Sequence, residues 1–317
     1  MEKQVSDLID NLESFKSLIK SEIPNTTMVI CKDKFFMQKF AYRLACFIIC
    51  ENQLNATICQ NIEKNIFPDV YYLPQNKDVI LSEDVSFIIE KMSYSPLSSN
   101  YKVFILDNFE KANVQTQNKL LKSLEEPNEN SYFIILCAND DSMLPTVKSR
   151  CRKIEIGSLK NKEIEPIFND LFKNEKEKKM AKFLSKNYLG KAISIASDNK
   201  YFYLYNLAID IITNCKNSSN VLKYSAELIK NKDNLNLFFE IYYDCFSEMI
   251  YYKINGHCNY EVLDEVFISV ANDFSIGSII AILNNSLIVI EQIFRNCNIP
   301  LIIDTVLLDN LQFKAQK

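Results

Sequence analysis

Residues 102–156 have the sequence KVFILDNFEKANVQTQNKLLKSLEEPNENSYFIILCANDDSMLPTVKSRCRKIEI, from Lys102 to Ile156. Two apolar runs, Val103–Leu106 and Phe133–Cys137, lie on either side of a segment whose apolar residues have helical spacing. Runs that are apolar at consecutive positions are typical of strands that are buried on both faces of a parallel sheet. This region therefore predicts a strand, a helix and a second strand, followed by the proline-containing segment Leu144–Cys151.

The same alternation extends over a longer part of the chain, from Thr27 to Ile156. We therefore expect an α/β domain with a parallel sheet over residues 1–157. After Gly157 the strand pattern stops, and two short helical patterns, the second ending near Gly190, predict a small helical lid over residues 158–200. The predicted strands are Met28–Cys31, Val70–Leu73, Val103–Leu106, Phe133–Cys137 and Lys153–Ile156.

Residues 201–317 show apolar residues at helical spacing only, and predict an all-α C-terminal domain. The predicted helices are Leu204–Ile212, Val221–Ile229, Leu235–Tyr252, Val262–Val270, Ile276–Phe294 and Leu301–Phe313.

The composition is that of a globular protein, with 317 residues of which 48% are apolar. A net charge of -4 gives no overall field that attracts nucleic acid, so DNA contact would need a local patch or partner subunits. The apolar stretch Ile279–Ile290 is interrupted by Asn284, Asn285 and Ser286, and we expect no membrane span and no secretory signal. Ten cysteines in such a chain favour reduced thiols and a cytoplasmic location.

Several motifs occur together in order and spacing. They are Pro68–Asp69, Ser95–Pro96, the Leu-Leu-Lys-x-Leu-Glu-Glu-Pro helix within Asn118–Pro127, and the segment Leu144–Cys151. With these residues the chain resembles the delta-prime subunits of the bacterial DNA polymerase III clamp loader, which are members of the AAA+ superfamily. The resemblance covers most of the first 200 residues. It implies an AAA+-type domain, a lid and, from length and helical character alone, a C-terminal collar that forms the oligomer.

The expected nucleotide site lacks the glycines of a phosphate loop, because all four glycines of the chain follow Ile156. Glycines let backbone N–H groups approach a phosphate closely. The segment at the expected place is Lys32–Lys39, and an alignment anchored on the two alanines of the next helix puts Met37 at the phosphate-binding lysine and Gln38 at the magnesium-binding hydroxyl. Lys34 or Lys39 could still attract a phosphate, although a lysine near a helix start is usually a solvated surface residue. We expect a degenerate site that binds no nucleotide.

The residues that follow the predicted strand Val103–Leu106 also indicate a site that hydrolyses no ATP. In active members of the superfamily the strand ends in an aspartate followed by a glutamate, whereas here Asp107 is followed by Asn108. An amide cannot act as a general base, so we expect no hydrolysis at this site. We interpret Asp107 as a residue that holds the turn after the strand.

The resemblance implies that Ser149, Arg150 and Cys151 lie at the edge of the domain. Arg150 would then reach the ATP site of the adjacent subunit and stabilise charge on the terminal phosphate, in trans. An alternative is that Arg150 is one of three solvated basic residues, together with Lys148 and Arg152.

Cysteines also match part of a zinc module that the resemblance brings with it. Cys50 and Cys59 have the spacing of its first two ligands, but Ile62 and Asn65 stand at the next two places. Closed tetrahedral zinc needs four N or S donors, and Cys46 would supply only a third thiolate. We expect no bound zinc.

The function implied is that of a subunit that is not an enzyme by itself and has no cofactor of its own. It would assemble with the delta subunit and with gamma or tau subunits, which bind the ATP, and help to load the sliding clamp onto primed DNA. Two alternatives stay open. One is an autonomous ATPase similar to gamma or tau, and the other is a DNA-repair adaptor derived from the AAA+ fold.

Overall fold

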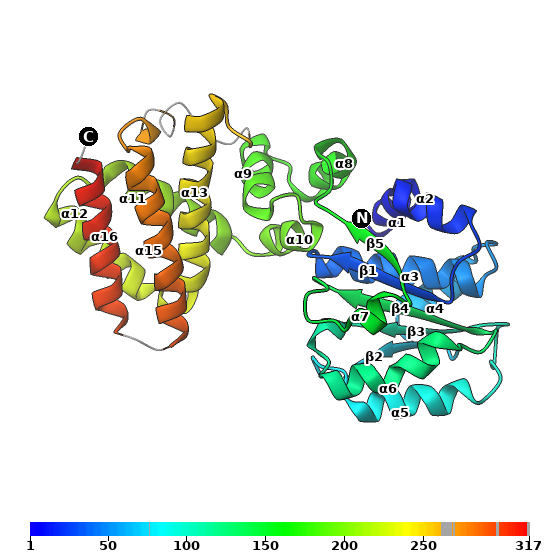
Figure 1. Ribbon diagram of the computed structural model, residues 1–317. Coiled ribbons are helices and arrows are strands. Elements are labelled where there is room, and N and C mark those ends of the chain that lie inside the picture. Colours follow the sequence, from blue (N-terminus) through cyan, green and yellow to red (C-terminus); the bar gives the residue numbers. More distant parts are fainter. Residues whose placement is uncertain (76, 261–267, 269, 296–297, 316–317) are drawn as a thin grey trace. The chain divides into compact units, whose positions relative to one another are not determined.

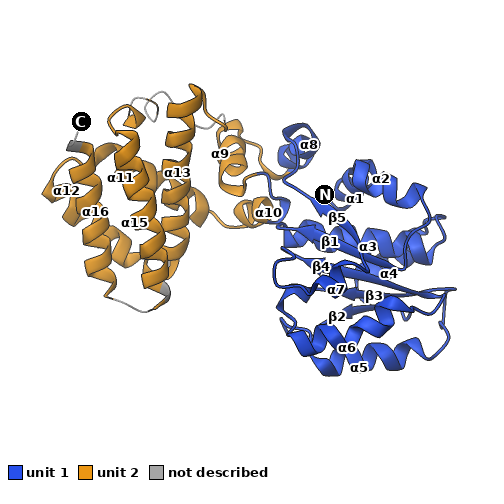
Figure 2. Ribbon diagram, in the orientation of Figure 1, with its two compact units in different colours: residues 1–170, 187–190 blue, residues 171–186, 191–317 orange. Residues whose placement is uncertain are grey.

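A computed structural model describes the chain except residues 76, 261–267, 269, 296–297 and 316–317 (Figure 1). The chain forms two compact units (Figure 2). The first unit consists of Met1–Asp170 and Asn187–Gly190, and the second of Leu171–Lys186 and Lys191–Lys317. The predicted division into three domains is not tested by these units and stays a prediction.

The first unit is built on a five-stranded sheet in which every strand pairs in parallel, in the order β2-β3-β4-β1-β5. This confirms the predicted α/β fold class. The strands are β1 (Thr26–Cys31), β2 (Val70–Leu73), β3 (Lys102–Leu106), β4 (Ser131–Cys137) and β5 (Arg152–Ile156).

Among the helices of the first unit, α1 and α2 precede β1, α8 follows β5, and the others lie between successive strands (Figure 1). The helices of this unit are α1 (Glu2–Asn11), α2 (Glu13–Lys20), α3 (Lys34–Ile49), α4 (Ala56–Glu63), α5 (Ser82–Met92), the short 3-10 helix η1 (Phe109–Lys111), α6 (Val114–Glu125), α7 (Pro145–Lys148) and α8 (Asn161–Leu171).

Both faces of the central strands are buried. Phe104 and Leu106 of β3 belong to a core cluster with residues of α5 and α6, such as Ile88 and Leu120. Successive side chains of a strand point to opposite faces. The alternate residues of β3 are equally buried, and α3 packs against β1, β3 and β4. Burial on two faces explains why these strands are apolar at consecutive positions.

The second unit is helical within its described residues, which confirms the predicted C-terminal helices. The predicted helix Val262–Val270 lies largely outside the described residues. The helices of this region are α9 (Glu175–Ser185), α10 (Leu189–Ser197), α11 (Lys200–Asn214), α12 (Ser218–Lys230), the 3-10 helix η2 (Lys232–Asn234), α13 (Leu235–Asn255), α15 (Ile276–Phe294) and α16 (Ile299–Ala315).

Aromatic residues of α13 form the centre of this unit. Phe238, Tyr242 and Phe246 are each at most 1% exposed, and Phe246 packs edge-on against Phe274 with ring centroids 5.5 Å apart. The helix contacts α11 and α15, and α16 contacts α12 and α15. The unit is therefore a bundle with its own core.

By length and composition α15 is apolar enough to cross a membrane, since the window Ile276–Ile293 has a mean hydropathy of 1.6 and is 28% buried. Within the second unit it packs against α13 and α16. Ile279, Ile282 and Ser286 lie at helical spacing and are buried. We therefore interpret α15 as a helix of the bundle with one face exposed.

The sequence pattern placed the end of the second lid helix near Gly190, and this detail is wrong. The helix α9 ends at Ser185, and Lys186 and Asn187 take up the left-handed conformation with φ of 52° and 63°. Such residues end a helix without glycine when polar side chains tolerate this conformation. Gly190 is instead the second residue of α10.

Candidate functional site

The connection between β1 and α3, where the sequence predicts a degenerate nucleotide site, is two residues long. The strand ends at Cys31, the helix begins at Lys34, and only Lys32 and Asp33 lie between them. Asp33 caps the helix, because its Oδ1 accepts a hydrogen bond from the N–H of Phe36 at 3.2 Å. No glycine lies in this connection, and the N–H groups that would face a phosphate begin directly with a capped helix.

The residues singled out in this segment lie in different environments. Met37 is 2% exposed and belongs to the core, and the side-chain amide of Gln38 donates to the hydroxyl of Tyr42 at 3.3 Å. In a phosphate loop the lysine stands at the start of the helix, and the residue at that place is Lys34. The alignment on the alanines assigns Met37 to that place, and this assignment stays a prediction. The first residue of α3 is known from the structure and was not predicted from the sequence.

The side chain of Lys34 reaches the residues that follow β3. Its Nζ is 3.5 Å from Oδ2 of Asp107 and 3.4 Å from Oδ1 of Asn108. Oδ2 of Asp107 also accepts the hydroxyl of Tyr72 at 2.7 Å. Burial, and secondly the charge of Asp107, raise the pKa of Tyr72 well above its ordinary value. Asp107 is thus surrounded by groups of its own chain.

Asp107 also organises the turn that follows β3. Its Oδ1 accepts the backbone N–H of Asn108 at 2.9 Å. Asn108 is in the left-handed conformation with a φ of 51°, which asparagine tolerates better than most residues. These contacts are those of a residue that holds a turn at a strand end.

The motif Pro68–Asp69 has a structural task. Asp69 is completely buried, and its carboxylate accepts backbone N–H groups from Leu97, Ser98 and Ser99 at 2.7, 2.7 and 3.0 Å. It therefore fixes the loop that leads into β3 and links two of the motifs noticed in the sequence.

Arg150 lies just after α7 and is held by two groups of the first unit. Its Nη1 donates to the carbonyl of Thr146 at 2.7 Å, and its Nη2 forms an ion pair with Oε1 of Glu125. The side chains of Arg150 and Glu125 are 32% and 44% exposed. Glu125 is the last residue of α6 and part of the Leu-Glu-Glu-Pro motif, but its pairing with Arg150 was not foreseen from the sequence.

Ser149 and Cys151 close the last turn of α7. The hydroxyl of Ser149 donates to the carbonyl of Thr146 at 3.1 Å, and the thiol of Cys151 donates to the carbonyl of Val147 at 3.2 Å. Burial raises the pKa of Cys151 to about 12, so this thiol is not a nucleophile at neutral pH. Both residues support the backbone on either side of Arg150.

The neighbouring basic residues have other partners. Lys148 and Lys153 lie 3.6 and 2.6 Å from Oδ2 of Asp140, and Arg152 donates to the hydroxyl of Ser21 at 2.8 Å. Arg150 is therefore the member of this basic group that is paired with α6, and the group is not a uniform solvated patch.

Gln117 anchors the segment that leads to Arg150, and it was missed in the sequence. This buried side chain donates to the carbonyls of Ala112 and Ser142 at 2.9 and 3.3 Å, and it accepts the N–H of Leu144 at 2.9 Å. Leu144 precedes Pro145, the first residue of α7. A glutamine at a helical position that faces the core was the available signal.

The cysteines noticed in the sequence lie near one another on α3 and α4. The thiol of Cys46 is hydrogen-bonded to Cys59, and this bond, helped by the charge of Arg43, lowers the pKa of Cys59 to about 7. No group of three or more His, Cys, Asp or Glu side chains that could hold a metal ion is found among the described residues. The donor set does not fit zinc, and the prediction that no zinc binds awaits metal analysis.

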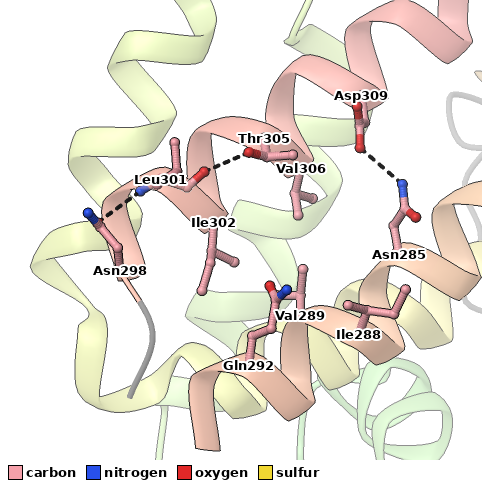
Figure 3. A pocket seen from close by; sticks show the side chains of 10 residues that line it. All are labelled: Asn285, Ile288, Val289, Gln292, Asn298, Leu301, Ile302, Thr305, Val306 and Asp309. Carbon is pink, nitrogen blue, oxygen red and sulfur yellow. Dashed lines mark hydrogen bonds between the residues drawn. The ribbon is translucent and has the colours of Figure 1, made fainter. Parts of the chain in front are cut away.

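A pocket of about 350 Å³ lies between α15 and α16 in the second unit (Figure 3). Oδ2 of Asp309 accepts the side-chain amide of Asn285 at 3.0 Å at one end of it. Its apolar rim is exposed, with Ile288 at 53% and Leu301 at 63%. The lining residues are Asn285, Ile288, Val289, Gln292, Asn298, Leu301, Ile302, Thr305, Val306 and Asp309.

Comparison with known proteins shows which family the first unit resembles. Residues 7–160 match the family described as "DNA polymerase III, delta subunit". This is a similarity of slightly less than half of the chain. The match covers nearly all of the five-stranded sheet unit, including the Arg150 edge.

Two curated relatives carry names from this family. The chain is 30% identical over 179 residues to DNA polymerase III subunit gamma of Buchnera aphidicola subsp. Schizaphis graminum, which covers 56% of this chain and 44% of that protein. It is 25% identical over 154 residues to DNA polymerase III subunit delta' of Bacillus subtilis, which covers 48% of this chain and 45% of that protein. The alignment thus spans less than half the length of either relative.

A solved structure extends the likeness in fold to both units. It is a DNA polymerase III gamma subunit-related protein from Thermotoga maritima, with a TM-score of 0.50 and 16% sequence identity. The alignment covers 96% of this chain and 100% of that chain. At this identity the likeness shows the fold alone.

Proposed function

We propose that this chain is a delta-prime-type subunit of the DNA polymerase III clamp loader, which hydrolyses no ATP itself and supplies Arg150 in trans to a neighbouring ATPase subunit. The observation that carries the proposal is the connection between β1 and α3, which consists of Lys32 and Asp33. A clamp-loader domain without a phosphate loop has no backbone cradle for a triphosphate. It therefore contributes to the assembly by what it presents to its neighbours.

The geometry of Arg150 supports the second half of the proposal. The guanidinium is partly exposed, its position is set by Thr146 and Glu125, and its backbone is supported by the turn of α7. A guanidinium has five N–H donors in a planar fork, so contacts with one carbonyl and one carboxylate leave donors available for a phosphate. Exchange of Glu125 for a phosphate would replace one anionic partner by another.

The second unit supports a role in assembly. Ile288 and Leu301, which line the pocket of Figure 3, are exposed, and so is Leu308 of α16. Apolar side chains gathered on one face mark a surface that a partner subunit can cover. We propose that these helices form a collar with the delta and gamma or tau subunits, in the cytoplasm, and that contact with the clamp and primed DNA occurs through the complex.

The test is reconstitution of the loader from this chain with its delta and gamma or tau subunits. We expect Arg150→Ala to lower hydrolysis at the ATP site that it serves by about 10³-fold, the lower end of the range for such arginines, and to abolish clamp loading onto primed DNA. Arg152→Ala is the matched control, because Arg152 has a different partner, Ser21, and should leave both rates unchanged.

Wild-type clamp loading by Arg150→Ala would refute the proposed role of Arg150. It would leave the assignment to the assembly untouched, which is tested by co-purification of this chain with delta and gamma or tau.

A second candidate is an autonomous ATPase, favoured by the 30% identity to a gamma subunit. Lys34 beside Asp107 would be the remnant of its site. Titration of the isolated chain with ATP and Mg²⁺ separates the two, since micromolar binding would favour the gamma-like function. A repair adaptor of the same fold would fail to co-purify with loader subunits.

A further inference from the structure

The carboxylate of Asp33 serves the N-termini of two helices. Besides its bond with Phe36 of α3, it accepts the backbone N–H of Gly190, which lies 3.2 Å from Oδ1 and 3.1 Å from Oδ2. Gly190 is the second residue of α10, so its N–H is one of those that the helix itself leaves without a partner. Asp33 is 6% exposed, and both contacts lie within the first unit.

An anion at such a place has a clear physical reason. The first N–H groups of a helix point outward, and the helix dipole favours negative charge there, which is why phosphates bind at helix N-termini. A carboxylate attached to the chain satisfies the same groups at all times. Asp33 thus provides the charge and the acceptor oxygens that an external phosphate would provide at the start of α3.

Lys34 adds a charge of the opposite sign on the neighbouring side. Its Nζ lies 3.5 Å from Asp107, at the strand end where a nucleotide-binding relative would place a divalent cation. Asp33 has the negative charge of a phosphate, and Lys34 has the positive charge of a metal ion. Both charges belong to the chain itself.

Gly190 fits this arrangement because a side chain would not. A Cβ at this position would lie 2.8 Å from Oδ1 of Asp33 and 2.8 Å from Cβ of Phe35. Real Cβ atoms do not approach other atoms this closely, so the close contact between position 190 and the start of α3 requires glycine. The neighbouring Leu189 is completely buried, and Asn187 donates to Oδ1 of Asn161 at 2.9 Å.

We propose that Asp33 is a built-in substitute for a nucleotide phosphate, which holds the segment Asn187–Gly190 on α3 whether or not nucleotide is present. In a nucleotide-dependent domain the contact between this segment and the helix would form and break with the ligand. Here it is permanent. The inference does not depend on the role proposed for Arg150, because it concerns the isolated chain.

The test is amide hydrogen exchange of the isolated full chain, measured by mass spectrometry on peptides that contain residues 187–190. We expect Asp33→Ala to speed exchange at Gly190 by about fivefold to tenfold, the size of effect that loss of a helix cap produces. Gly190→Ala should do the same, since the added Cβ forces the segment away from Asp33.

Asn113→Ala is the matched control. Asn113 caps α6 by accepting the N–H of Thr116 at 2.8 Å, so its loss costs a comparable cap but touches neither α3 nor Gly190. Exchange at Gly190 should stay at the wild-type rate in this variant.

Two results would overturn the inference. One is an unchanged exchange rate at Gly190 in a folded Asp33→Ala or Gly190→Ala variant. The other is slower exchange at Gly190 in the wild-type chain when ATP and Mg²⁺ are added, because a ligand would then do what we assign to Asp33.

Discussion

The start of α3 and the edge that carries Arg150 handle charge in opposite ways. At the start of α3, Asp33 and Asp107 are 6% and 4% exposed and accept hydrogen bonds from groups of their own chain. At the edge, Arg150 and Glu125 are 32% and 44% exposed. Separating a buried, paired carboxylate from its donors is expensive, whereas an exposed ion pair is worth only about 0–1 kcal/mol. The hydrogen bonds of Asp33 and Asp107 are therefore costly to break. The ion pair of Arg150 with Glu125 is cheap to break, so Arg150 can bind another anion instead.

The largest effect that separates the two regions should come from Arg150→Lys. Lysine keeps the charge but has no planar fork, so it cannot hold two oxygens at fixed geometry. We expect hydrolysis at the ATP site that Arg150 serves to fall by about 10²-fold or more, approaching the loss in Arg150→Ala. Single-turnover ATPase measurements with primed DNA and clamp provide the check. Recovery of wild-type rates by Lys would show that charge alone is needed at the edge.

Gln117→Leu should lower the free energy of unfolding, because Gln117 holds the segment that leads to α7 and Arg150. The substitution leaves the N–H of Leu144 and the carbonyls of Ala112 and Ser142 without their partner. An unpaired buried polar group costs about 1–3 kcal/mol, so we expect a loss of roughly 2–4 kcal/mol in the free energy of unfolding. Urea denaturation measures it, with Asn139→Ala as an exposed control. A loss below about 0.5 kcal/mol would mean that water replaces this amide.

Glu125→Gln should barely change the stability of the fold. The exposed ion pair of Arg150 with Glu125 differs in this respect from the buried helix cap Asp33. We expect the free energy of unfolding to change by less than about 1 kcal/mol, because exposed ion pairs contribute little. The carbonyl of Thr146 still holds Arg150 in this variant. Urea denaturation beside Asp33→Ala, which removes a buried cap, compares the regions directly. A greater loss in Glu125→Gln than in Asp33→Ala would reverse the contrast drawn above.

Cysteine reactivity should set both regions apart from α4, and this is the smallest of the expected effects. Burial raises the pKa of Cys31, next to the start of α3, to about 11, and that of Cys151, next to Arg150, to about 12. Cys59, with its pKa lowered to about 7, lies on α4. Because the thiolate is the reactive form, Cys59 should react with iodoacetamide first of these three, with a rate that rises through pH 7.

Cys46→Ala tests the cause, since it removes the thiol that is hydrogen-bonded to Cys59. The midpoint of the pH–rate profile should then move up toward that of an ordinary thiol. Peptide mapping by mass spectrometry identifies the labelled residue, and preferential labelling of Cys31 or Cys151 would contradict the burial found at both regions.

The apolar pattern predicted the fold well because burial acts on whole segments. Val103–Leu106 and Phe133–Cys137 are strands since both their faces are covered, and that constraint is visible residue by residue. The helices of the second unit were visible for the same reason, as spacing along a single element.

The contacts of the candidate site were less accessible, because they join residues far apart in the chain. Asp33 meets Gly190 across 157 positions, and no local pattern at either residue indicates the other. The pairing of Arg150 with Glu125 depends on where two side chains point at the ends of α6 and α7. The helix α3 begins at Lys34 after its cap Asp33, whereas the alignment that singled out Met37 followed alanines further along the helix.

The short connection between β1 and α3 also limits which activities this protein could gain by mutation. To form a phosphate loop, the chain would need several inserted residues between Cys31 and Lys34, since point substitutions cannot lengthen a turn. Any insertion that entered the helix would rotate Phe36 and Phe40, both at most 1% exposed, out of the core. Under the proposed function, single substitutions therefore cannot create nucleotide binding in this chain, and we expect natural variation to change its surfaces instead.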